Sequence, residues 1–143
     1  MNPERETTSK VMKPKRPKRR LTIADVMTPQ PLTIGRDQRL VTAHKMMAEN
    51  GIRHLPVLER GALIGVVSQR DLYFVETIAG VDKFADKVED AMTNDARSFG
   101  PETPIADVAR EMYEHKLGCA VVVERDRVVG IFTAMDALRI LAH

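Results

Sequence analysis

Cysteine and tryptophan are nearly missing from this chain of 143 residues, which has one cysteine and no tryptophan. With Cys119 alone, the chain cannot have an internal disulfide framework, and this usage is typical of the reducing cytoplasm. No apolar run approaches the roughly 20 residues that a membrane helix needs. The basic N-terminus lacks the apolar core of a secretory signal. We therefore expect a cytoplasmic protein without a membrane span.

The motifs of common catalytic and cofactor sites are also missing. The sequence has no P-loop and no Gly-x-Gly-x-x-Gly, and no nucleophile, base and oxyanion hole can be assembled from it. His44, His115 and His143 stand at no metal-ligand spacing and are expected on helix surfaces. Cys119 has no activating neighbour and is expected to be a packed thiol. These observations predict a protein that is not an enzyme, with no metal site and no required cofactor.

The net charge of +2 conceals an uneven distribution. Residues 1–20 carry eight basic and two acidic side chains, whereas the rest carries fourteen basic and eighteen acidic ones. With Pro14 and Pro17 among its charges, this segment is predicted to be a disordered or extended arm. It could contact nucleic acid, an acidic membrane or an acidic partner. A solubilising role is favoured, because no aromatic residue is interleaved to stack on bases.

An internal repeat organises the remaining sequence. A shift of 65 positions brings residues 26–75 onto residues 91–140 without a gap, and ten of the fifty pairs are identical. Apolar positions coincide along the whole register, as two copies of one supersecondary unit require. The copies contain "LIGVVSQRD" and "VVGIFTAMD", so each has an apolar run, a glycine, a hydroxyl residue and a carboxylate in that order.

Each copy predicts the same series of elements. A short helical turn ends at "DVMT" or "DAMT", and an extended piece follows, "PLTI" or "ARSF". An amphipathic helix comes next, because apolar residues recur at spacings of three and four. These residues are Leu40, Ala43 and Met47 in the first copy and Ile105, Val108, Ala109 and Met112 in the second. The methionines among them are interpreted as core rather than as a cofactor site.

Two apolar runs after this helix predict strands, "HLPVL" and "ALIGVV" in the first copy, "CAVVV" and "VVGIF" in the second. They do not alternate with polar residues, so both faces of the sheet should be covered. Pro56 cannot donate to a ladder and is expected at a strand start or an edge. A final helix begins at Ser68 or Thr133.

The predicted fold class is therefore α/β (α+β), with the order β-α-β-β-α in each copy. The copies span residues 21–80 and 81–143 and are related by a pseudo-twofold axis. Their sheets are packed between helices, and each copy covers apolar surface that the other would leave exposed.

The repeated hydroxyl and carboxylate have a structural explanation. "SQRD" and "TAMD" both match the capping box, in which the two side chains satisfy free backbone N–H groups at a helix start. That role alone would account for Ser68 with Asp71 and for Thr133 with Asp136.

The same arrangement also suits a nucleoside. A helix N-terminus attracts an anion, and a carboxylate in the first turn can accept hydrogen bonds from ribose hydroxyls. Gly65 and Gly130 could let a flat ring approach the strand backbone. Both interpretations stay open on these residues alone.

The motifs resemble those of the CBS domain, the module named for cystathionine beta-synthase. "VMTPQPLTI…GIRHLPVLERGALIGVVSQRDL" resembles one copy, and "AMTNDARSF…KLGCAVVVERDRVVGIFTAMDAL" resembles another. Together they resemble a stand-alone tandem, or Bateman module, covering residues 21–143. The resemblance implies a cleft between the copies for an adenosine-containing ligand such as AMP, ADP, ATP or S-adenosylmethionine.

The resemblance also implies roles for particular residues. Asp71 and Asp136 would bind ribose hydroxyls, and Ser68 and Thr133 would contact ribose or phosphate. The base would be flanked by Thr33, Ile34, Ser98 and Phe99. The same pockets would be lined by Leu55, Pro56 and Val57 and by Ala120, Val121 and Val122.

The copies differ where charge matters. The first has Arg53–His54 before its strand and Arg70 in its final helix, where the second has Gly118–Cys119 and Met135. Arg53 offers a planar donor fork suited to phosphate, and His54 adds a pH-sensitive donor. Both could instead be solvent-facing residues at the start of a strand. We expect two unequal sites with at most one good phosphate clamp, and the sequence leaves open which ribose carboxylate serves it.

These features predict a regulatory sensor that binds an adenine nucleotide and acts on an effector protein through a ligand-linked conformational change. A homodimer is expected, with contacts around Leu72, Tyr73 and Phe74 and around residues 138–141. The alternatives are a ligand-free dimerisation scaffold, a nucleic-acid-associated protein acting through the basic arm, and a weak enzyme that turns over a bound nucleotide.

Overall fold

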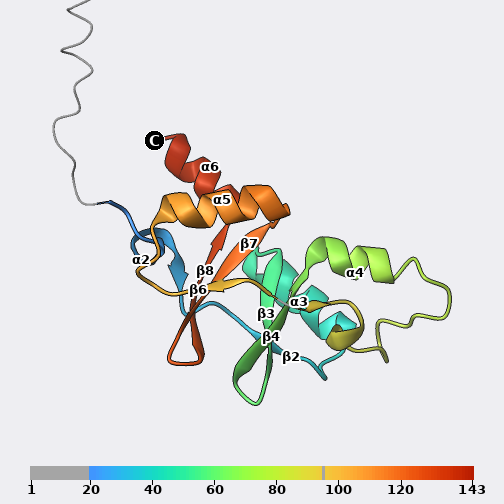
Figure 1. Cartoon of the computed structure of the whole chain (residues 1–143). Helices are drawn as coiled ribbons and strands as arrows, with labels where there is room; N and C mark the ends of the chain where they lie inside the picture. The colour runs from blue at the N-terminus through green and yellow to red at the C-terminus, as the bar shows by residue number, and fades with distance from the viewer. Residues whose placement is uncertain (1–19, 95) are drawn as a thin grey trace, which may run out of the picture.

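The computed structural model describes residues 20–94 and 96–143, so the predicted arm lies almost entirely outside the described residues. The first half contains α2 (Ile23–Val26), β1 (Thr28–Pro29), β2 (Ile34–Gly35), α3 (Leu40–Asn50), β3 (His54–Glu59), β4 (Ala62–Ser68) and α4 (Gln69–Val75). The second contains η1 (Val88–Asp90), β5 (Thr93–Asn94), β6 (Ser98–Phe99), α5 (Ile105–His115), β7 (Cys119–Glu124), β8 (Arg127–Thr133) and α6 (Ala134–Leu141) (Figure 1).

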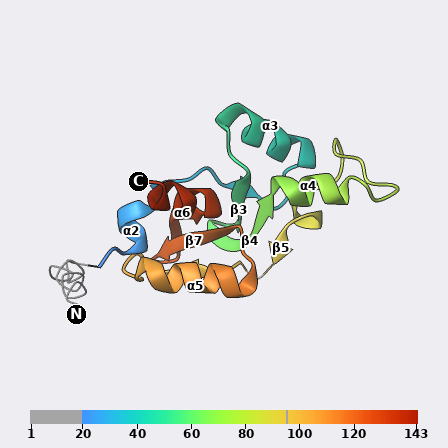
Figure 2. The same ribbon diagram turned by 90° about the horizontal axis from the view of Figure 1, so that it is seen from above.

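Each half follows the predicted order β-α-β-β-α, from β2 to α4 and from β6 to α6. The two sheets lie between helices, with α3 on one side and α5 on the other (Figure 2). The predicted fold class is confirmed. No helix in the described part of the chain is long and apolar enough to span a membrane.

The two sheets exchange one two-residue strand each, which the sequence did not predict. One sheet has the order β2-β3-β4-β5 and the other β1-β8-β7-β6. Thus β1, from the first half, pairs antiparallel with β8, and β5, from the second half, pairs antiparallel with β4. Each sheet is therefore completed by a strand from the other sequence repeat.

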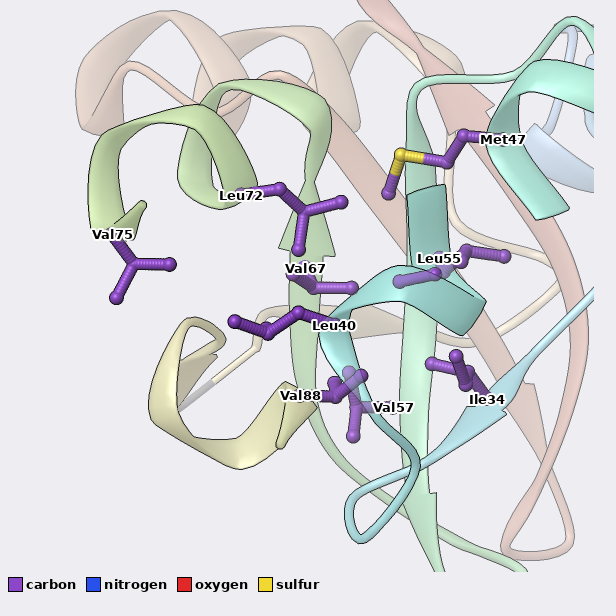
Figure 3. Packing of buried hydrophobic residues seen from close by; sticks show 10 residues of the cluster. Ile34, Leu40, Met47, Leu55, Val57, Val67, Leu72, Val75 and Val88 are labelled. Carbon is purple, nitrogen blue, oxygen red and sulfur yellow. The ribbon is translucent and has the colours of Figure 1, made fainter. Parts of the chain in front are cut away.

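The two hydrophobic cores show the same exchange. The first core packs α3, α4 and the β2–β4 strands around Leu40, Leu55 and Val67, and it includes Val88 from η1 (Figure 3). The second core includes Ile23 from α2, which is fully buried. Burying an isoleucine or valine side chain stabilises a fold by roughly 1.5–3 kcal/mol. These exchanged residues therefore join the halves into one cooperative unit.

Gly65 and Gly130 make room for this exchange rather than for a ring, which corrects one expectation from the sequence. A Cβ at Gly130 would lie 2.1 Å from the sulfur of Met27, and one at Gly65 would lie 2.6 Å from the Thr93 carbonyl oxygen. Met27 and Met92 thus each pack on the glycine of the other sequence repeat. The repeated methionine and the repeated glycine therefore contact each other, once in each sheet.

Pro56 also differs from its expected position. It lies inside β3, a strand between β2 and β4, and it is fully buried opposite Val66. At the corresponding position in the second sheet, the Val121 N–H donates to the carbonyl of Arg97, which precedes β6. β2 begins at Ile34, opposite Val57. The missing N–H therefore faces the segment just before β2, outside the residues that pair in that strand, and the bond that Val121 makes at this position has no counterpart at Pro56.

Candidate functional site

Among the cavities of the described residues, two adjoin the starts of the final helices α4 and α6. We call them the Asp71 pocket, of about 620 Å³, and the Asp136 pocket, of about 720 Å³. The Asp71 pocket is lined by Arg53, His54, Val66, Ser68, Gln69, Arg70, Asp71, Thr93, Ala96, Arg97, His115, Lys116, Leu117, Gly118 and Cys119. The Asp136 pocket is lined by Thr28, Gln30, Pro31, Leu32, Asn50, Gly51, Ile52, Arg53, His54, Gly118, Ile131, Thr133, Ala134, Met135, Asp136 and Arg139.

Both walls combine residues from the two sequence repeats, and the two pockets are related by the 65-residue shift. The strand exchange explains this mixing, because Thr93 of β5 reaches the first sheet and Thr28 of β1 reaches the second. A ligand in either pocket would therefore contact both halves of the chain.

Ser68 and Asp71 form the predicted capping box at the start of α4. Asp71 N–H donates to Ser68 Oγ at 3.0 Å, and Ser68 N–H donates to Asp71 Oδ2 at 2.9 Å. Within the described residues, Asp71 Oδ1 has no hydrogen-bond partner. The structural and the ligand-binding interpretations are thus compatible, since Oδ2 caps the helix and Oδ1, left without a partner among these residues, belongs to a residue that lines the pocket.

Thr133 and Asp136 form the same box at the start of α6, with one added contact. Asp136 Oδ2 accepts from Thr133 N–H at 2.8 Å, and Oδ1 accepts from Arg139 at 2.7 Å. Burial opposes ionisation of this carboxyl, but the hydrogen bonds from Thr133 and Arg139 outweigh it and lower the pKa of Asp136. Asp136 is therefore a charged acceptor that already holds a guanidinium.

The N-termini of α4 and α6 have fewer free N–H groups for an anion than the sequence suggested. The Gln69 N–H donates to the Arg53 carbonyl at 2.9 Å, and the Ala134 N–H donates to the Gly118 carbonyl at 3.0 Å. Together with the two capping boxes, these bonds use most first-turn amides. Any phosphate in these pockets would have to be bound chiefly by side chains.

Arg53 and His54 line both pockets, as does Gly118. A Cβ at Gly118 would lie 2.8 Å from His54 Nε2, so the glycine makes room for the imidazole. Burial lowers the pKa of His54 and outweighs the opposite effect of Asp71, while the Arg53 charge lowers it further. His54 is therefore neutral near pH 7.

Three cations besides Arg53 line the Asp71 pocket, Arg70, Arg97 and Lys116. Only Arg70 was predicted as a site residue. Arg97 and Lys116 could have been found from the repeat, because they correspond to Leu32 and Gly51 and so mark a change of charge between copies. Arg97 also donates to Glu111 Oε1 on α5 at 3.1 Å.

Several predicted site residues lie outside the lining of both cavities. Strand side chains alternate between faces, so Leu55 and Val57 enter the first core, and Ala120 and Val122 enter the second. The remaining residues outside the lining are Thr33, Ile34, Pro56, Ser98, Phe99 and Val121. Contact between any of these residues and a ligand stays a prediction.

Two other candidates have structural roles. Cys119 is buried, and burial raises the pKa of its thiol to about 12, as expected of a packed thiol rather than a nucleophile. His115 is exposed on α5, as expected. Contrary to the expectation about its spacing, ligand atoms of His115, Glu111 and Glu114 fall within 4.8 Å of one another. Arg97 already binds Glu111 and His115, so this group does not argue for a metal.

Comparisons with known proteins agree with this geometry. A homoserine O-acetyltransferase from Methanococcoides burtonii is 34% identical over 122 residues, covering 84% of this chain but only 24% of the enzyme. This chain therefore spans about a quarter of that relative's length.

Two solved structures have the same fold. The crystal structure of a putative acetoin utilization protein, AcuB, from Vibrio cholerae has a TM-score of 0.77 and 33% identity, covering 87% of this chain and 92% of that one. The crystal structure of CBSX2 in complex with AMP has a TM-score of 0.74 and 30% identity, covering 85% and 96%. The model of the CBS domain matches residues 23–76 and 88–143. This chain therefore belongs to the CBS domain family and carries two CBS domains in tandem.

Proposed function

We propose that this chain is a regulatory module that binds adenosine-containing ligands in the Asp71 and Asp136 pockets. The observation that carries the proposal is the carboxylate at the wall of each pocket, fixed by a capping box at the end of a central strand. The 30% identical CBSX2 in complex with AMP supports a nucleotide of this class.

The carboxylates suit the two hydroxyls of a ribose. Asp71 Oδ1 has an open acceptor position, and Asp71 Oδ2 is held in place by the Ser68 amide. Hydrogen bonds to a charged acceptor contribute about 1.5–3 kcal/mol each, so a vicinal diol gains both affinity and orientation there. Asp136 offers the same geometry once Arg139 shares its Oδ1 or moves aside.

Regulation follows from the mixed walls of the pockets. A ligand that touches residues of both repeats favours one relative position of the two sheets, and any partner that senses this position gains or loses affinity by linkage. We propose that an effector protein reads this change in the cytoplasm and that the module itself does not catalyse a reaction.

Calorimetric titration of the full chain with AMP, ATP and S-adenosylmethionine tests the proposal. Saturable heat with at least one of them, together with a rise in melting temperature, is expected. The absence of both heat and a thermal shift with all three ligands would contradict it.

The exposed faces of α4 and α6 favour a second, compatible function in dimerisation. Phe74 and Tyr73 on α4 are 69% and 57% exposed, and Leu138 and Leu141 on α6 are 58% and 82% exposed. Leu72, which was also expected at such a contact, is instead fully buried in the first core. We propose a homodimer through these two helices, because clustered apolar side chains on a surface mark interaction sites.

Sedimentation equilibrium tests the dimer. Phe74→Glu and Leu141→Glu should each shift the chain toward the monomer, whereas Tyr113→Glu on the exposed side of α5 should not. A monomeric parent protein at micromolar concentration would contradict the proposed dimer.

A further inference from the structure

The two pockets differ in charge far more than in shape. Besides Arg53, which they share, the Asp71 pocket has Arg70, Arg97 and Lys116 among its described lining residues, and the Asp136 pocket has only Arg139. Moreover, Arg139 is already paired with Asp136 at 2.7 Å. Arg97 is also paired, with Glu111 at 3.1 Å, but no ion pair is found for Arg70 or Lys116 within the described part of the chain.

The cations of the Asp71 pocket are replaced by apolar or small residues in its counterpart. Leu32 stands where Arg97 would be, Met135 where Arg70 would be, and Gly51 where Lys116 would be. Ile52 and Ile131 add to the apolar wall of the Asp136 pocket. A phosphate needs charged, hydrogen-bonding partners when it leaves water, and this wall supplies few.

The shared residues increase the difference. Arg53 and His54 can face a phosphate in only one pocket at a time, and the second repeat has Gly118 and Cys119 at the corresponding positions. Once Arg53 is engaged in the Asp71 pocket, the Asp136 pocket has lost its one unpaired cation.

We infer that the pockets divide their ligands by charge. The Asp71 pocket binds a nucleotide through its phosphate, and the Asp136 pocket binds an adenosine derivative without phosphate. The inference rests on the proposed function, and it specifies that one phosphate-bearing ligand binds strongly per chain.

The repeat offers a reciprocal test, since corresponding residues can be exchanged. Leu32 is 43% exposed, and Arg97 is also exposed, so Arg97→Leu and Leu32→Arg should both fold. Arg127→Leu makes the same charge change at a position that lines neither pocket. All four proteins are titrated by calorimetry with AMP and, separately, with adenosine.

The parent chain should bind one AMP tightly and two adenosine molecules with similar affinities. Arg97→Leu should weaken AMP by about tenfold to a hundredfold while adenosine changes less than about threefold. Leu32→Arg should create a second strong AMP site, and Arg127→Leu should match the parent.

Two results would overturn the inference alone: equal binding of AMP in both pockets of the parent chain, or an unchanged ratio of AMP to adenosine affinity in Arg97→Leu. If the parent chain bound none of AMP, adenosine, ATP and S-adenosylmethionine, the proposed function itself would be contradicted. The inference, which rests on that function, would then be contradicted as well.

Discussion

At the scale of single residues, a glycine in one half packs against a large side chain from the other half. His54 occupies the space left by the missing Cβ of Gly118, and Met27 occupies the space left by that of Gly130. The sequence analysis identified repeated glycines but not the side chains that pack on them. Those side chains lie in the other repeat, and the periodicity of one segment does not reveal packing between repeats. The carboxylates of the sites, Asp71 and Asp136, were easier to predict, since capping boxes are local.

His54 should make the stability of the protein depend on pH. Burial lowers its pKa from 6.5, so the unfolded chain takes up this proton more readily than the folded chain. The stabilisation is complete above pH 6.5 and is lost as the pH falls below it, at no more than about 1.4 kcal/mol per pH unit for one proton. Urea unfolding at pH 7.5 and 5.5 should show a smaller loss in His54→Gln than in the parent. An equal loss in both proteins would show that His54 does not contribute.

Gly65→Ala should destabilise the fold strongly. Its new Cβ would lie 2.6 Å from the Thr93 carbonyl oxygen, which belongs to the backbone and cannot turn away. Forced overpacking costs typically about 1–3 kcal/mol, and denaturant unfolding measures it. Gly100→Ala is the control, because there the nearest atom is a flexible Glu102 oxygen at 3.5 Å. Equal stability of Gly65→Ala and Gly100→Ala would contradict this account of the exchange.

At the scale of elements, periodicity and capping predicted well. The spacing of Leu40, Ala43 and Met47 correctly placed α3, and the "SQRD" motif correctly placed Ser68 as the N-cap of α4. The prediction that Pro56 lies at a strand start or an edge was wrong. A proline is excluded from an inner strand only where the neighbouring strand would accept its N–H, and β2 has only two residues. The strands β1 and β5 have only two residues each, which is too short for a periodic pattern. Their exchange between the sheets could therefore not be predicted from the sequence.

Ser68→Ala should separate the capping role from ligand binding. The Asp71 N–H would lose its acceptor at 3.0 Å, and losing such a cap costs about 1 kcal/mol of stability. Thermal unfolding without ligand measures this loss. Ser9→Ala, in the segment that the sequence predicts to be an extended arm, is the control and is expected to leave the melting temperature unchanged. A Ser68→Ala protein as stable as the parent would mean that the box does not support α4.

At the scale of the whole molecule, the exchange makes two sequence repeats into one structural unit. Family membership and fold class followed from the repeat and its motifs, and unequal sites were expected from Arg53, His54 and Arg70. The contribution of Arg97 and Lys116 to the charge of one pocket emerged only when the lining residues were brought together. Arg97 and Arg53 are 44 positions apart in sequence and come from different repeats, yet they line one cavity. No local sequence pattern predicts that these two residues line the same cavity.

Ile23→Ala tests whether the halves unfold together. Ile23 is fully buried in the second core although it lies in the first repeat, and truncating a buried isoleucine costs about 2–5 kcal/mol. We expect a single denaturant transition at lower concentration, with hydrogen exchange accelerated in both sheets. Leu21→Ala, at a position 43% exposed, should have little effect. Separate transitions for the two halves would contradict a cooperative unit.

The most direct measurement of the central claim is calorimetric titration of Asp71→Asn with AMP. The asparagine keeps an acceptor for the Ser68 amide but removes the charged acceptor for a ribose, so AMP affinity should fall by about tenfold or more while the chain stays folded. Asp136→Asn should weaken adenosine binding in the other pocket, and Asp126→Asn, in the β7–β8 turn, should leave both affinities unchanged. If Asp71→Asn and Asp136→Asn both bound AMP and adenosine as tightly as the parent, the two carboxylates would be helix caps only.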